Sequence, residues 1–169
     1  MAYASKQQSD VTFGYKPSFS TEGIFDYGLS DDKKAFTITF NGLGASVGNT
    51  KAPTPPPVDA RAFSIVIPMA GGGPVSTVVT TTGFAMATEG ANGTLVFTIN
   101  GDARIFPVGP GFDGEILHSF DLEASGLSEM RISLQLLVER DSAFPDAAAT
   151  LTINAIDTDL VLARGRSPS

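Results

Sequence analysis

Apolar and polar residues alternate along most of this chain, as they do in strands that bury one face. In the segment Ala35–Phe40, the apolar Phe36, Ile38 and Phe40 share one face and the threonines lie on the other. The same period of two recurs, between turn residues, in seven further segments: 63–67, 75–86, 95–99, 103–108, 116–122, 132–138 and 151–162. About eight strands without intervening helices predict an all-β fold, an antiparallel β-sandwich or jelly roll with little or no helix. A closed barrel is the alternative.

One hairpin has a turn that the sequence specifies in detail. We predict a three-residue loop over 99–101 with Gly101 in the left-handed conformation, which places Phe97 beside Ala103. A two-residue loop would instead place Phe97 beside Arg104 and bring a charge into the buried face. The hydrophobic pattern therefore favours the longer, bulged loop.

Two segments leave their local structure open. In the last segment, residues 151–155 and 156–162 bury opposite parities, which predicts a β-bulge near Ala155 and Ile156. Residues 127–138 fit a helical period as well as an alternating one. Because the surrounding chain is β-rich, we favour a strand there.

The chain divides into a polar, aromatic-containing N-terminal arm over 1–30, a β-sandwich domain over 31–163 and a C-terminal tail over 164–169. Within the domain, residues 49–60 hold four prolines, which exclude a helix or a central strand. This stretch is expected to be a stiff surface loop, either a plain connector or a contact arm.

The arm concentrates aromatic side chains without clean alternation. Tyr15, Phe19, Phe25 and Tyr27 are the candidate binding residues, because exposed rings stack on sugars or pack against another subunit. The alternative is an irregular stretch folded over its own sandwich.

Charge and composition exclude several classes of function. With 18 acidic and 11 basic residues the net charge is −7, and the basic residues are scattered, so nucleic acid is not an expected partner. The chain holds no cysteine and no run of 18 apolar residues, so neither disulfides nor insertion into a membrane is expected.

No motif assembles a recognisable active site. The sequence Gly44–Gly48 matches the G-x-S-x-G pattern of a nucleophile elbow, but prolines follow where the elbow needs a helix, so we interpret it as a glycine-rich turn. His118 has inward parity and is expected to be a core or rim histidine. Asp157 and Asp159 point to one side of the last strand and are interpreted as solvated charges or as protection of an edge strand, and calcium ligation by the acidic turn residues is the alternative. We expect no catalytic residue, no metal site and no cofactor.

One stretch of the chain resembles a known family. The residues Leu29–Phe40 and, after a loop, Arg61–Pro68 resemble an uncharacterised family of small secreted β-sandwich proteins. This chain lacks that family's cysteines. The resemblance implies extracellular or surface placement and no assigned activity.

Together these features predict a non-catalytic structural or interaction protein. It would self-associate or bind another protein through its arms and loops. The alternative is a carbohydrate-binding module that uses exposed aromatic residues.

Overall fold

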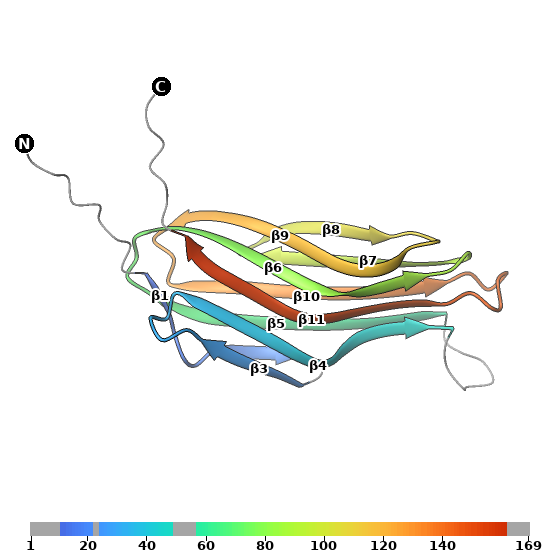
Figure 1. Cartoon of the computed structure of the whole chain (residues 1–169), viewed down its shortest axis with the longest axis horizontal. Coiled ribbons are helices and arrows are strands. Elements are labelled where there is room, and N and C mark those ends of the chain that lie inside the picture. The colour runs from blue at the N-terminus through green and yellow to red at the C-terminus, as the bar shows by residue number, and fades with distance from the viewer. Residues whose placement is uncertain (1–10, 22–23, 49–56, 162–169) are drawn as a thin grey trace, which may run out of the picture.

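The computed structural model describes residues 11–21, 24–48 and 57–161, and over these ranges the chain forms two antiparallel sheets that face each other (Figure 1). No helix occurs in these ranges, so the predicted all-β sandwich is confirmed. The sequence gives about eight strands from residue 31 onward, and the structure has β4 to β11 there. Three short strands precede them.

Strand order places distant segments side by side. The first sheet has the order β1-β5-β10-β7-β8, with β2 also paired to β5. Its strands are β1 (Thr12–Phe13), β2 (Ser18–Thr21), β5 (Val58–Ala70), β7 (Ala91–Ile99), β8 (Asp102–Val108) and β10 (Glu129–Arg140). The second sheet has the order β3-β4-β11-β6-β9. Its strands are β3 (Ile24–Leu29), β4 (Ala35–Val47), β6 (Pro74–Ala87), β9 (Asp113–Ser125) and β11 (Ala149–Val161). From β4 onward only the β7–β8 connection stays within one sheet, so loops gather at the two ends of the sandwich.

The core fills the space between the sheets. Alternate side chains of both inner faces are fully buried, among them Phe36, Phe63, Phe97 and Phe120. Rings from opposite sheets meet edge to face, as in the Phe97–Phe120 pair, whose centroids are 6.0 Å apart. Burial of these alternating apolar residues, each contributing roughly 1.5–3 kcal/mol, holds the two layers together.

Both open points of the sequence are settled by strand pairing. Residues 129–140 form the strand β10, which pairs with β5 and β7 on its two sides, so the predicted strand is confirmed over the helix. In β11 the register shifts between Ile153 and Ala155, which confirms the predicted bulge. The intervening Asn154 is exposed, and inward parity resumes at Ile156.

The predicted three-residue loop of the β7–β8 hairpin is wrong. Ile99 pairs with Asp102, so Asn100 and Gly101 form a two-residue turn, both with positive φ (49° and 86°). Phe97 therefore lies opposite Arg104. The charge is tolerated because β8 is an edge strand: the exposed Arg104 guanidinium lies 4.2 Å from the centroid of the Phe120 ring and stays in contact with water.

The structure corrects three further expectations. Asp157 does not protect an edge, because β11 is the central strand of its sheet and Asp157 accepts a hydrogen bond from Thr37 Oγ1 (2.6 Å). Ser46 lies within β4 opposite Thr150, so Gly44–Gly48 is mostly strand rather than turn. The first residues of β5, from Val58 to Ala60, belong to a strand rather than to the predicted proline-rich loop. Residues 49–56 and the tail 164–169 lie outside the described residues.

Candidate functional site

The predicted N-terminal arm, where it is described, contributes edge strands to both sheets. The strands β1 and β2 pair with β5, and β3 pairs with β4 of the other sheet. The segment thus runs along one side of the sandwich, the lower side in Figure 1. This position places the four predicted aromatic residues along the same side of the sandwich.

Two of the four rings pack against the core. The Phe25 ring lies 5.3 Å from Phe63, centroid to centroid, in an edge-to-face contact that joins the two sheets. The Tyr27 ring contacts Phe36 (5.7 Å), and its hydroxyl donates a hydrogen bond to the carbonyl oxygen of Gly14 (3.1 Å). Burial raises the pKa of Tyr27 to about 12. Phe25 and Tyr27 therefore anchor the segment.

The other two rings face solvent. Phe19 has inward register, opposite Ile65, but β2 is so near the edge that 61% of the side chain stays exposed. Its ring meets Phe25 edge to face at 4.8 Å. Tyr15 is 64% exposed and lies in the connection between β1 and β2. The structure thus pairs Phe19 with Phe25, and it leaves Tyr15 on a separate part of the same side.

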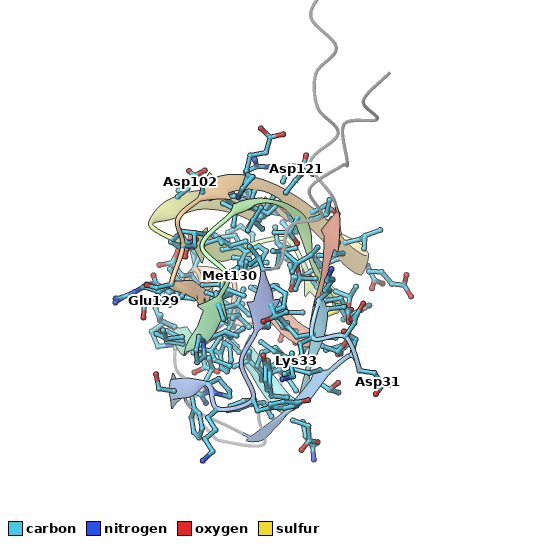
Figure 2. The ribbon with its side chains drawn as sticks, turned by 90° about the vertical axis from the view of Figure 1, so that its left-hand side faces the viewer. Asp31, Lys33, Asp102, Asp121, Glu129 and Met130 are labelled. Carbon is cyan, nitrogen blue, oxygen red and sulfur yellow. The ribbon has the colours of Figure 1, made fainter. Side chains whose placement is uncertain are left out.

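A cation beside Tyr15 is a feature that the sequence analysis missed. Lys33 Nζ lies 4.7 Å from the centroid of the Tyr15 ring, a cation–π contact. Lys33 has positive φ (57°) in the β3–β4 turn, whose side chains cluster at the end of the molecule seen in Figure 2. The Asp-Asp-Lys-Lys run just before the predicted strand at residues 35–40 signals a turn, but the fold alone brings it next to Tyr15.

Hydrogen bonds hold that turn in place. Asp32 Oδ1 accepts hydrogen bonds from Ser30 Oγ (2.6 Å) and from the backbone N–H of Lys34 (3.0 Å). The bond from Ser30, followed by the bond from Lys34, lowers the pKa of Asp32. Ser30 Oγ also accepts the backbone N–H of Ala35 (2.9 Å). These bonds fix the backbone that presents Lys33 to the tyrosine ring.

The surroundings offer stacking and charge rather than acid–base chemistry. Within the described ranges, no group of three or more His, Cys, Asp or Glu residues is placed to hold a metal ion. His118 stacks on Phe106 with ring centroids 3.6 Å apart, far from these residues in the strand order, and burial lowers its pKa. His118, expected to be a core or rim histidine, is half-buried. The part of the chain that the structure describes has no helix able to span a membrane.

Comparisons with known proteins find only distant structural neighbours. No family model and no curated protein matches the chain. The module TmCBM61, solved in complex with β-1,4-galactotriose, has a TM-score of 0.38 at 11% identity, covering 86% of this chain and 88% of that chain. The CBM35 module of Cellvibrio japonicus Abf62 has a TM-score of 0.31 at 11% identity, with coverages of 89% and 92%. Scores this low carry no functional conclusion, so function must be argued from the surfaces of this chain.

Proposed function

We propose that the protein is a non-catalytic interaction protein that binds a partner protein through the exposed rings of Tyr15 and Phe19. The observation that carries the proposal is their exposure, above 60% for each ring, on a segment whose neighbouring rings are fixed in the core. Covering such a ring releases roughly 25 cal/mol per Å² of apolar surface, and prior fixation lowers the entropy lost on binding.

Aromatic anchors of this kind suit a protein partner. Tyrosine is enriched among the residues that dominate binding energies, and phenylalanine is enriched in interfaces generally. Lys33, on the exposed turn beside Tyr15, adds a positive charge in a chain of net charge −7. A partner segment with an apolar residue could pack on the exposed rings, and a carboxylate in the same segment could pair with the Lys33 ammonium.

Selection of peptides from a random library on the purified full chain tests this proposal. We expect most selected peptides to bind Phe19→Ala and Tyr15→Ala at least about fivefold more weakly, a loss of about 1 kcal/mol. Phe84→Ala is the matched control, because Phe84 is also exposed but lies on β6 of the other sheet. If most selected peptides bind Phe19→Ala and Tyr15→Ala as tightly as they bind the wild type, the proposal is overturned.

Carbohydrate binding is the second candidate, and the Tyr15–Lys33 contact favours it. The cation lies over the Tyr15 ring, and an exposed ring beside an ammonium donor can stack on a sugar and donate to its hydroxyls. A glycan array probed with the wild-type chain and Tyr15→Ala tests it. Saturable binding that weakens in Tyr15→Ala supports this candidate, whereas silence across a broad array excludes it.

Extracellular or surface placement also stays a prediction, supported by the resemblance of Leu29–Phe40 and Arg61–Pro68 to a family of secreted proteins. Fractionation of the source cells with an antibody against the chain tests it. Recovery only in the soluble intracellular fraction would contradict it.

A further inference from the structure

The two outer faces of the sandwich differ sharply in charge. None of the five strands of the second sheet contains a lysine or an arginine. Strand register and exposure place six carboxylates on its outer face: Asp26, Asp113, Glu115, Asp121, Glu123 and Asp157. Like charges at this density repel a second copy of the chain.

The outer face of the first sheet is instead nearly uncharged. Register places Ala62, Gln135, Val96 and Ile105 in one row across β5, β10, β7 and β8. The next row holds Ala60, Leu137, Thr94 and Pro107 in the same strand order. Ile105 is 66% exposed although it is a large aliphatic side chain. These two rows form a mostly apolar patch in the middle of the face, which we call the sheet-1 patch.

Charged groups on this face lie at the ends of β10. At one end, Arg131 Nε donates to Glu129 Oε1 (2.6 Å), so these two charges cancel. Figure 2 shows Glu129 on the outside of the molecule and its neighbour Met130 in the interior. At the other end stands the single exposed carboxylate of Glu139. The centre of the face therefore offers apolar surface without a net field.

We infer that the sheet-1 patch is the interface between two copies of this chain. Four strands about 4.8 Å apart, over a paired length of roughly 30 Å, give the whole outer face an area on the order of 600 Å² per copy, with the sheet-1 patch in its middle. Two such faces bury about 1,200 Å² in total, the lower limit for a standard interface. Sheets that pack face to face lie about 10 Å apart with interdigitated side chains, and a two-fold axis matches the patch with itself.

Charge decides which of the two outer faces a second copy can approach. Two chains of net charge −7 approach at least cost where carboxylates are fewest, and that is the sheet-1 patch. A strongly basic partner would instead favour the acidic outer face of the second sheet. Gln135 lies in the middle of this face, where its side-chain amide can both donate a hydrogen bond to Gln135 of the second copy and accept one from it.

This interface goes beyond the proposed function and uses different residues. Tyr15 lies in the β1–β2 connection, and Phe19 has the inward register of Ile65. Neither side chain belongs to the outward rows of the sheet-1 patch. A dimer through this patch leaves both rings available for a partner protein.

Light scattering coupled to size-exclusion chromatography of the full chain tests the inference, with Ile105→Lys against Leu117→Lys. The two residues lie on neighbouring edge strands with nearly equal exposure (66% and 69%), but Leu117 faces outward from the second sheet. We expect a dimer for the wild type and Leu117→Lys at about 100 µM, and at least tenfold weaker association for Ile105→Lys. Ala62→Lys, on another strand of the patch, should behave like Ile105→Lys.

Circular dichroism of each variant establishes that it is folded before its mass is compared. If the wild-type chain stays monomeric up to about 500 µM, the free energy of dimer formation is weaker than about 4.5 kcal/mol, and the inference is overturned. A dimer that survives both Ile105→Lys and Ala62→Lys also overturns it. A dimer lost in Phe19→Ala but not in Ile105→Lys would mean that copies associate through the arm, and it would leave the arm's binding role standing.

Discussion

At the scale of single residues, burial decides which aromatic side chains anchor the N-terminal segment and which face a partner. Tyr27 shows the first role most clearly, because its ring packs on Phe36 while its hydroxyl bonds to the Gly14 carbonyl. That bond ties β3 of one sheet to the chain next to β1 of the other. Phe19, six residues before the anchoring Phe25 in the same arm, stays 61% exposed.

Tyr27 also predicts how stability changes at alkaline pH. Its pKa is about 12 in the folded protein, against 10.0 unperturbed, because burial disfavours the phenolate. Stability from this group is thus fully present below pH 10 and is lost as pH rises towards 12. We expect Tyr27→Phe to lose about 1 kcal/mol near neutral pH with its hydrogen bond, but to show less alkaline destabilisation than the wild type.

Urea unfolding at a series of alkaline pH values measures this, with tyrosinate absorbance as a second readout. The component that titrates near pH 12 should disappear in Tyr27→Phe. An unchanged titration curve in that variant would show that Tyr27 is not the shifted group.

At the scale of elements, the bulge in β11 shapes the middle of the second sheet. The extra residue between Ile153 and Ala155 lies next to Gly83 of the neighbouring β6, which pairs with Ile153. A Cβ atom at Gly83 would lie 2.0 Å from the carbonyl oxygen of Thr152. The glycine is therefore required by the close approach of two backbones.

We expect Gly83→Ala to destabilise the protein by roughly 1–3 kcal/mol, because the strand backbone must shift to admit the methyl group. Gly114→Ala is the matched control on the adjacent strand β9, where nothing lies within 4 Å of the added Cβ. Removal of backbone freedom from the unfolded chain should leave that variant unchanged or up to about 1 kcal/mol more stable. The urea concentration at the midpoint of unfolding measures the stability of each variant, provided that the dependence of the unfolding free energy on urea is unchanged. Equal midpoints for Gly83→Ala and Gly114→Ala would contradict the close approach of the two backbones at Gly83.

At the scale of the whole molecule, the sandwich presents one acidic face and one nearly neutral face. In Figure 1 the strands of both sheets run along the long axis, so each face is continuous from end to end. The asymmetry cannot be read from the net charge of −7, which is a property of the whole sequence. It arises because outward positions of the second sheet carry six carboxylates, whereas outward positions of the first sheet carry Glu129, paired with Arg131, and Glu139.

This asymmetry predicts that salt strengthens dimer formation. Raising NaCl from about 20 mM to about 300 mM shortens the screening length from roughly 20 Å to 6 Å and weakens repulsion between like-charged copies. We expect the dissociation constant to fall several-fold in sedimentation experiments, with Ile105→Lys monomeric throughout. A dissociation constant that rises with salt would show that opposite charges hold the copies together.

The sequence by itself determined the secondary structure and most of the core. Alternation is a local property, and it identified the positions of β4 to β11, a strand rather than a helix over 132–138, and the bulge near residue 155. It could do so because an apolar set on one face must be buried whatever the topology. It gave the wrong loop at Asn100 and Gly101, since it treated Arg104 as buried. Only the edge position of β8 shows that Arg104 remains solvated.

Tertiary structure alone decided where surfaces form. Strand order places β11 at the centre of its sheet, brings Lys33 to Tyr15 and puts Phe25 between two sheets. It also separates Ile105 and Leu117 onto opposite outer faces, although both look alike in an alternating sequence. These relations depend on which distant strands pair, and pairing is set by the packing of the whole core rather than by any local pattern.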